Sequence, residues 1–315
     1  MHAVTIADKS LSWASHPDPE PGVGEVLVRV RAAGINSADR LQVMGFYPAP
    51  PGSPDDIPGL ELAGTVEGVG PGVTQWSEGD RVMAVVGGGA MAELAVVHER
   101  HLLPVPSTLS WEQAGGFAET YTTAHDALFT QVGLSMGERV CIHGAAGGVG
   151  TSAVQLARAA GCVVTATVRN ESLRDAVHDL GADVVVDPED FADAGPFDVI
   201  LELVGAPNWP GNVSALATWG RIMIIGVGAG ATVESFSLLD LMQKRATIRA
   251  STLRARPLEE KANAAQAMIR HVLPGVAAGA LTVPVEATFP MASADEAFDR
   301  FAAGGKLGKI VLLND

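Results

Sequence analysis

Two patterns of apolar residues divide the chain. Through roughly the first 115 residues, short β-like segments such as Glu25–Val30 alternate with clusters of proline and glycine, which predicts an all-β, loop-rich unit. The proline-rich segment 48–54 is expected to be a stiff exposed loop. A helical region is expected to begin at Trp111. The N-terminal part is therefore expected to lack βαβ repeats.

The middle of the chain follows a different pattern. Continuous apolar runs alternate with segments of helical periodicity, and such strands are typical of parallel βαβ units buried on both faces. This alternation predicts a doubly wound α/β sheet of the dinucleotide-binding kind. Strands are expected before Gly144 and at 162–168, 184–186, 199–204, 221–225 and 246–250, with helices at 151–160 and 173–180; the last two strands are expected to end the sheet.

After about residue 250 the β-rich unit is expected to resume. The pattern predicts a helix at 258–272, a strand at 281–285, a second helix at 294–303 and a last strand at 310–313. One unit is thus formed from both ends of the chain, and the nucleotide-binding sheet is inserted between them.

The segment Val140–Gly150 carries the strongest chemical signal. A short apolar strand leads into a turn with glycines at 144, 147 and 150, and a helix pattern begins directly behind it. Glycine lets backbone amides approach a ligand closely, and the start of a helix directs its positive dipole end to the same point. The turn predicts an anion site suited to a pyrophosphate.

The residues after the second strand favour NADPH. Proteins that bind NAD usually carry Asp or Glu there for the ribose 2′-hydroxyl, whereas a 2′-phosphate requires a cation. Residues 166–170 contain no acid and include Arg169, whose guanidinium offers several donors to a phosphate, and Asn170 and Ser172 add neutral ones. The alternative is that Arg169 is a solvated loop residue, and Glu171 weakens the local positive field.

Composition excludes several classes of protein. The formal charge of −15 repels nucleic acid, and no basic patch offsets it. No apolar run approaches the ~20 residues that cross a bilayer, and the first ten residues lack a signal sequence, so a cytoplasmic protein without a membrane partner is expected. The two cysteines, Cys141 and Cys162, are too few for a disulfide scaffold or a cysteine-rich zinc lobe and are expected to be buried.

Several separate blocks of the sequence resemble the medium-chain dehydrogenases/reductases, within them the zinc-free quinone oxidoreductase branch typified by zeta-crystallin. The resemblance implies a GroES-like catalytic domain from residues 1–117 and 252–315 and a Rossmann domain at 118–251, with the substrate in the cleft between them. Besides the glycine turn, the blocks that carry it are Gly34–Asp39, Gly45–Tyr47, Ile57–Val66, Gly79–Val82, Leu180–Asp183 and Gly308–Leu312.

The resemblance also bears on metal. Zinc-using relatives place a cysteine where Asn36 stands and a histidine where Leu60 precedes Glu61, and neither Asn nor Leu is a ligand that zinc selects. No metal is therefore expected. Without a Lewis acid, the easier reaction is hydride donation to an electron-poor acceptor, which is a quinone or an α,β-unsaturated carbonyl.

Roles of single residues follow from the same resemblance. Asn36 and Tyr47 are implied to face the nicotinamide and the acceptor, and the Tyr47 phenol to donate a hydrogen bond to the acceptor oxygen. The alternatives are that Tyr47 packs a proline-rich loop, that Asn36 binds its own backbone in a turn, and that the hydroxyl of Thr123 packs a helix. The implied cofactor contacts are Asn36, Thr123, Ala146, Gly147, Gly148, Val149, Arg169, Asn170, Ser172, Val204, Gly226, Val227, Thr252, Leu253 and Lys306.

Three positions depart from the family pattern. Leu41 replaces a second tyrosine, which makes the acceptor pocket more apolar or more open on that side. Leu173 stands where NADPH-binding relatives frequently have lysine, which leaves phosphate recognition to Arg169, with Arg174 as a candidate helper. Lys306 replaces an asparagine, and its charge either assists the cofactor phosphates or faces solvent. His143, just before the glycine turn, is expected to be packed and hydrogen-bonded rather than catalytic.

The leading hypothesis is an NADPH-dependent, metal-free quinone reductase. An alkenal or enoyl reductase is close behind, because hydride delivery to a conjugated β-carbon demands nearly the same geometry. A third hypothesis is an NADPH-binding protein of this fold without turnover. The apolar strands at the end of the expected sheet also predict a homodimer with a sheet continuous across the twofold axis.

Overall fold

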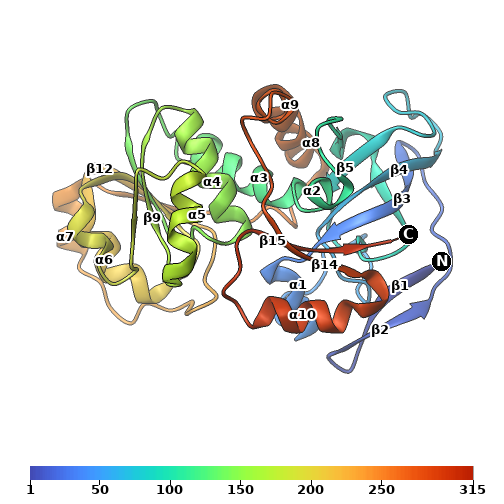
Figure 1. The fold of residues 1–315 in the computed structure, drawn as a ribbon, viewed down its shortest axis with the longest axis horizontal. Helices are drawn as coiled ribbons and strands as arrows, with labels where there is room; N and C mark the ends of the chain where they lie inside the picture. Colours follow the sequence, from blue (N-terminus) through green and yellow to red (C-terminus); the bar gives the residue numbers. More distant parts are fainter. Residues whose placement is uncertain (315) are drawn as a thin grey trace. The chain divides into compact units, whose positions relative to one another are not determined.

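A computed structural model describes residues 1–314, which fold into two compact units. Unit 1 comprises Met1–Thr122, Leu253–Gly304 and the chain from Lys309 onward. Unit 2 comprises Thr123–Thr252 together with Gly305–Gly308, so a short piece of the C-terminal region returns to it (Figure 1).

Unit 2 is built on a six-stranded sheet in the order β10-β9-β8-β11-β12-β13, with every neighbouring pair parallel. This order reverses direction between β8 and β11, which is where open α/β sheets bind ligands. The predicted doubly wound sheet is therefore confirmed. Its elements are β8 (Arg139–Ile142), α4 (Gly148–Ala159), β9 (Val163–Thr167), α5 (Arg174–Asp179), β10 (Val184–Val186), β11 (Phe197–Glu202), α6 (Trp209–Ala215), β12 (Leu216–Ile224), α7 (Leu238–Lys244) and β13 (Thr247–Ala250).

Unit 1 contains a seven-stranded sheet in the order β14-β15-β3-β4-β5-β7, with β6 also paired to β3, and a separate hairpin of β1 and β2. Alternate side chains of β3 are buried, as expected for a strand with one face on a core. The elements are β1 (His2–Ala7), β2 (Ser10–Ser15), β3 (Glu25–Gly34), α1 (Ser37–Val43), β4 (Glu61–Val69), β5 (Arg81–Val85), β6 (Leu94–His98), β7 (Leu102–Pro104), α2 (Trp111–Gly115), α8 (Leu258–Ala267), α9 (Leu273–Ala277), β14 (Val285–Pro290), α10 (Ala294–Ala302) and β15 (Lys309–Leu313); α3 (Ala118–His125) contains the boundary with unit 2.

Two expected elements of unit 1 are placed differently. The prediction of a strand at 281–285 is wrong, because the strand begins at Val285 and runs to Pro290 beside β15. Leu281 and Val283 are instead buried side chains of the connection, and the carbonyl of Thr282 accepts a hydrogen bond from the Tyr121 hydroxyl. The N-terminal region is also not entirely β, since α1 lies within it.

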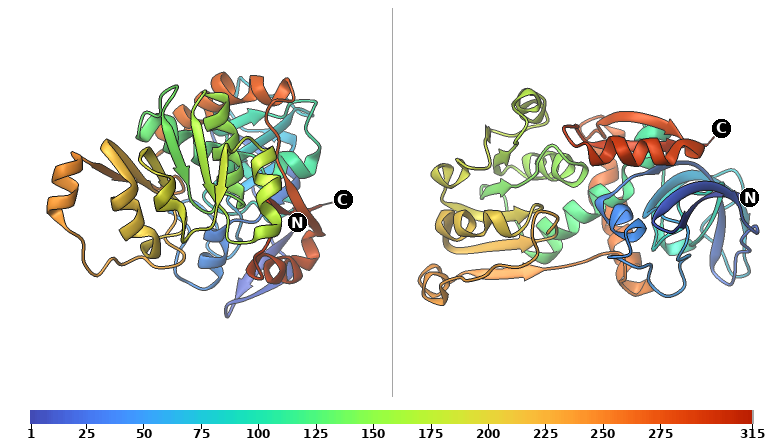
Figure 2. Two further views of the ribbon diagram at one scale, coloured as in Figure 1. Left: turned by 60° about the vertical axis from the view of Figure 1, so that its left-hand side comes forward. Right: turned by 90° about the horizontal axis from the view of Figure 1, so that it is seen from below.

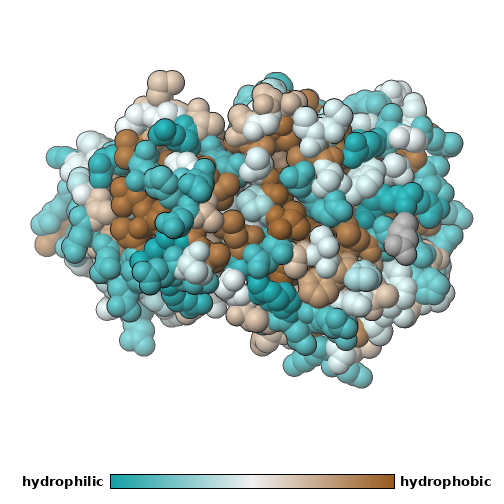
Figure 3. All heavy atoms as spheres, viewed as in Figure 1, coloured by the Kyte–Doolittle hydropathy of each residue, from teal (hydrophilic) through white to brown (hydrophobic). Residues whose placement is uncertain are grey.

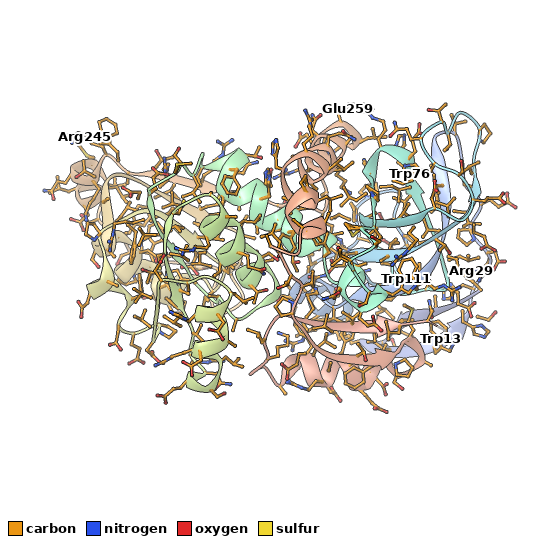
Figure 4. All side chains as sticks on the ribbon, turned by 45° about the horizontal axis from the view of Figure 1, so that its top comes forward. Trp13, Arg29, Trp76, Trp111, Arg245 and Glu259 are labelled. Carbon is orange, nitrogen blue, oxygen red and sulfur yellow. The ribbon has the colours of Figure 1, made fainter. Side chains whose placement is uncertain are left out.

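The core and the surface follow the apolar pattern. Both cysteines are buried and free, as expected. On the face drawn in Figure 3, hydrophilic residues surround separate apolar patches. Trp111, labelled in Figure 4, lies at the start of α2 and stacks under the Arg81 guanidinium at 4.3 Å from its ring centroid. Among the helices of residues 1–314, none combines the length and apolarity that crossing a bilayer requires.

Candidate functional site

The glycine turn of unit 2 has the geometry of a phosphate cradle. Gly144 adopts φ 60°, and a Cβ on Gly150 would lie 2.4 Å from the Gly144 carbonyl oxygen, so both positions require glycine. Helix α4 begins directly behind Gly147, and no side chain caps it. Its first amides have no intrahelical acceptor and carry the positive end of the helix dipole. Ala146 to Val149 thus form a surface that fits a dinucleotide pyrophosphate.

Neighbouring strand ends complete this edge of the sheet. Val204 follows β11, and a Cβ on Gly144 would lie 3.4 Å from its side chain. Gly226 follows β12, and a Cβ there would lie 2.3 Å from the Leu203 carbonyl oxygen, which makes glycine necessary. The sequence-predicted residues Ala146–Val149, Val204 and Gly226 are therefore brought together at the topological switch point.

A buried hydrogen-bond network supports these turns. Glu202 ends β11 and is 3% exposed; its Oε1 accepts the amides of Val204 (2.7 Å) and Gly205 (2.8 Å), while its Oε2 accepts Asn212 Nδ2 (2.7 Å). Asn208 Nδ2 donates to both oxygens at 3.2 Å. The carboxylate is thus solvated by protein N–H groups in place of water, as a buried charge requires.

His143 extends the network to the glycine turn. Its ring is fully buried, with Nε2 2.7 Å from Asn212 Oδ1 and Nδ1 3.1 Å from Thr167 Oγ1. Burial lowers the pKa of His143 against the charge of Glu202, so the ring is neutral and donates through Nε2. Thr167 Oγ1 in turn accepts the Gly144 amide at 3.3 Å. The prediction that His143 is packed and hydrogen-bonded is confirmed.

The candidate 2′-phosphate site follows β9. Arg169 and Asn170 are exposed, and Asn170 Oδ1 accepts hydrogen bonds from the amide and hydroxyl of Ser172, which shapes the turn into α5. Arg174 is committed elsewhere, because its guanidinium donates to the Val168 carbonyl (3.1 Å) and to Asp187 (2.8 Å). Arg174, the candidate helper, is therefore already paired, and Arg169 is the exposed arginine of this turn.

The segment 305–308 brings Lys306 to the same edge of unit 2. The Gly308 amide donates to the Ala146 carbonyl at 2.8 Å, and Gly147 and Gly308 form a parallel bridge. At the other end of the segment, a Cβ on Gly305 would lie 3.6 Å from Asn170 Nδ2. Lys306 thus belongs to a segment that runs between the glycine turn and the candidate 2′-phosphate turn after β9.

Unit 1 holds the candidate acceptor residues at one end of its sheet. Strand β3 ends at Gly34 and runs antiparallel to both β4 and β15, so the end of β3 meets the starts of the other two strands. Asn36 follows β3, Glu61 begins β4 and Lys309 begins β15. The Lys309 ammonium lies 2.7 Å from Glu61 Oε1, with side-chain exposures of 3% and 0%. Neither Lys309 nor Glu61 had a predicted role at this site.

Tyr47 is held by a second buried cation. The Arg254 guanidinium donates to the carbonyls of Gly87 (2.7 Å) and Tyr47 (2.9 Å) and to Gln42 Oε1 (2.6 Å). It also lies 5.0 Å from the centroid of the Tyr47 ring. Burial raises the pKa of the Tyr47 hydroxyl and outweighs the opposing charge of Arg254, so the phenol stays protonated and can donate.

Asp39 anchors the loop that joins these groups. It is fully buried in α1 and accepts the amides of Asn36 (2.7 Å) and Gly59 (3.1 Å). Burial raises its pKa to about 7, although the Asn36 amide and the charge of Lys309 act in the opposite direction. Asp39 thus fixes Asn36 through the backbone at the start of α1.

The other predicted residues are placed as follows. Thr123 is buried within α3, Val227 is 46% exposed after β12, and Thr252 is exposed at the last position before the unit boundary. Leu253 is buried in unit 1, where it lines a small cavity of about 10 Å³ together with His101 and Lys261. Within residues 1–314 no cluster of three His, Cys, Asp or Glu side chains has the arrangement of a metal site.

Comparison with known proteins assigns the chain. Residues 22–107 match the family model described as alcohol dehydrogenase GroES-like domain, and residues 148–270 match the one described as zinc-binding dehydrogenase. The chain is 31% identical over 308 residues to quinone oxidoreductase of Rattus norvegicus, covering 94% of this chain and 91% of that protein. The chain belongs to the quinone oxidoreductase family of medium-chain dehydrogenases/reductases. It is an oxidoreductase with a GroES-like and a Rossmann part, as predicted.

Solved structures agree with this assignment. An alcohol dehydrogenase superfamily protein from Novosphingobium aromaticivorans has a TM-score of 0.89 at 30% identity, with both chains fully covered. A mycobacterial protein complexed with NADPH has a TM-score of 0.87 at 28% identity, again with both chains fully covered. The fold of this family member is therefore one that binds a nicotinamide dinucleotide.

Proposed function

We propose that this oxidoreductase transfers a hydride from NADPH to a quinone without a metal ion. The observation that carries the proposal is that one edge of unit 2 holds two features. One is a glycine cradle that fits a pyrophosphate, and the other is a turn with the exposed cation Arg169. Relatives named quinone oxidoreductase and the NADPH complex of a mycobacterial structural neighbour support the same acceptor and cofactor.

The residues present fit NADPH. The glycine positions leave the space that a pyrophosphate needs, the amides at the start of α4 supply donors, and Arg169 with Lys306 supplies positive charge for the 2′-phosphate. When bound, the cofactor supplies the hydride. Glu202, Asn212 and His143 hold the turns around it in place, and Gly226 and Val227 line the same edge.

Independence from zinc is supported by the position of Lys309. Its ammonium fills the space between Glu61 and Asn36, at 2.7 Å and 2.8 Å from their oxygens. Asn36 and Leu60 also stand where zinc-using relatives place their cysteine and histidine. The Glu61 carboxylate is thus already paired with a fixed ammonium group, and a metal ion would have to compete with that ammonium group for the carboxylate.

Tyr47 is proposed as the group that hydrogen-bonds the acceptor oxygen. Tyr47→Phe is expected to lower kcat by about 100-fold with a small change in KM, because a donor to a developing oxyanion acts mainly in the transition state. Steady-state kinetics with NADPH and a benzoquinone measure this. The matched control is Tyr121→Phe, which changes the only other tyrosine of the chain. The Tyr121 hydroxyl donates a hydrogen bond to the Thr282 carbonyl, so this variant is expected to be less stable and to have an unchanged kcat. Equal kcat values for Tyr47→Phe and the wild type would remove Tyr47 from the mechanism.

A panel of acceptors tests the reaction class. NADPH oxidation is measured with simple quinones and, separately, with alkenals and enones at matched concentrations. We expect the larger kcat/KM for the quinones. Turnover with conjugated carbonyls alone would assign the chain to the alkenal or enoyl reductases, and tight NADPH binding without any turnover would favour a non-catalytic binding protein.

A second copy of this chain is the proposed partner of β13. This strand ends the sheet with β12 as its only neighbour among residues 1–314, and its four residues are exposed. Figure 2 shows the adjoining α7 at the outer end of the sheet, and Arg245, which follows α7, is labelled in Figure 4. An open apolar strand edge is usually covered by pairing. The large apolar side chains that are exposed in residues 236–250, which include α7 and β13, are Phe236, Leu238, Leu239, Met242 and Ile248.

Sedimentation tests this dimer. The wild type is expected to sediment as a dimer at micromolar concentration, and Leu239→Glu/Met242→Glu as a monomer, because the pairing would bury two uncompensated charges. Val23→Glu is the control, since Val23 is 79% exposed in unit 1. A monomeric wild type would refute the dimer.

A further inference from the structure

The buried ammonium of Lys309 uses its three N–H donors within unit 1. They go to Glu61 Oε1 at 2.7 Å, to Asn36 Oδ1 at 2.8 Å and to the Ile35 carbonyl at 2.8 Å. The side chains of Lys309 and Glu61 are 3% and 0% exposed, so neither presents its charge to a ligand. Asn36, which is only partly buried, is the member of this trio that a ligand can reach.

The two charges leave the Asn36 amide one orientation. Nδ2 donates to Glu61 Oε1 at 3.0 Å and to the Gly34 carbonyl at 3.3 Å, while Oδ1 accepts from Lys309. A rotation by half a turn would place the amide NH₂ against an ammonium and the amide oxygen against a carboxylate. Both Nδ2 hydrogens are used, so Asn36 can meet a ligand only as an acceptor through Oδ1. Oδ1 also faces the Asp39 amide in the capping box of α1, but that amide donates to the Asn36 backbone carbonyl at 3.1 Å.

We propose that Lys309 is a positioning residue of the reductase: together with Glu61 it holds Asn36 so that Oδ1 accepts a hydrogen bond from the nicotinamide half of the cofactor. The inference rests on the proposed function. A quinone carries only acceptor oxygens and cannot donate to Oδ1, so the donor is a ribose hydroxyl or the carboxamide N–H of the cofactor. This assigns Asn36 to the cofactor and leaves the acceptor oxygen to Tyr47.

A double-mutant cycle tests whether Lys309 acts through Asn36. The dissociation constant of NADPH is measured for Lys309→Met, Asn36→Ala and the double variant. Each single variant is expected to raise it by about 5- to 10-fold, the loss of one hydrogen bond, and the double variant no more than Asn36→Ala alone. Adenosine 2′,5′-bisphosphate, which lacks the nicotinamide half, is expected to bind all variants as it binds the wild type.

The proposal would be overturned if the losses of NADPH affinity in the two single variants added up in the double variant. It would also be overturned if Asn36→Ala weakened NADPH binding and Lys309→Met left it unchanged. Repeating the cycle with the 3-acetylpyridine analogue of NADPH separates the two donors. An effect that persists with the analogue assigns the ribose hydroxyl, and an effect that disappears assigns the carboxamide; no effect of Asn36→Ala with either cofactor overturns the proposal.

A second variant guards against misfolding, because Lys309→Met leaves the Glu61 carboxylate buried without its cation. Glu61→Gln/Lys309→Met removes both charges at similar volume and is expected to fold and to show the same weakened NADPH binding. Wild-type affinity in this variant overturns the proposal. These measurements are of binding, so failure of the wild type to reduce quinones would reject the proposed function and leave the test of Lys309 readable.

Discussion

Arg169→Ala is expected to raise the dissociation constant of NADPH by about 10- to 100-fold and to leave that of NADH nearly unchanged. A hydrogen bond to a charged group contributes about 1.5–3 kcal/mol, which corresponds to that range. Arg169 is exposed after β9, and the neighbouring Arg174 is committed to Asp187, so no second arginine of that turn replaces the lost charge. Fluorescence titration with both cofactors measures the ratio.

Arg158→Ala is the matched control for Arg169. Arg158 lies on α4 of the same unit, is 60% exposed and pairs with Asp183. Its loss changes the net charge by the same amount, so an effect of long-range charge would appear in both variants. Equal preferences for NADPH in Arg169→Ala and the wild type would show that Arg169 is a solvated loop residue.

Glu202→Ala is expected to lower the free energy of unfolding by about 3–5 kcal/mol, as breaking a buried charged network does. The change leaves the amides of Val204 and Gly205 and the side chains of Asn208 and Asn212 without their acceptor. Chemical denaturation measures the loss. Because these amides belong to a proposed cofactor turn, NADPH binding should weaken in the same variant under conditions where it remains folded.

Glu67→Ala is the control for Glu202. Glu67 is exposed and pairs with Arg29 on the surface of unit 1, and such pairs contribute less than about 1 kcal/mol. If Glu202→Ala lowered the free energy of unfolding no more than Glu67→Ala does, water would have to enter the site and replace the carboxylate. The account of a charge solvated by protein groups would then fail.

The fold of unit 2 was predictable because its signals are local. Apolar runs gave the strands, the turn residues gave the glycine cradle, and the chain order of strands and helices allows few parallel arrangements. The misplaced strand in unit 1 shows the limit of such signals. Leu281 and Val283 have the same alternation as a strand, but they are buried in a connection, and the ladder begins only after Pro284.

The supporting residues of the site were not predictable in the same way. Glu61 and Lys309 are far apart in the sequence and meet only through the sheet of unit 1, and Arg254 reaches Gln42 and Gly87 only through the fold. The sequence does hold a partial signal, since Glu202 and Lys309 are charged residues inside apolar strand segments and a buried charge requires a partner. That signal shows that a partner exists and does not show which residue it is.

The most direct test of the account follows the reduced nicotinamide itself. The chain is dialysed against a chelator, loaded with NADPH and mixed rapidly with a benzoquinone while the absorbance of the reduced nicotinamide is recorded. The account predicts a loss of that absorbance whose rate rises with quinone concentration and is unaffected by the chelator. The account would be contradicted if quinone caused no loss of this absorbance. It would also be contradicted if the chelator abolished the reaction and added zinc restored it.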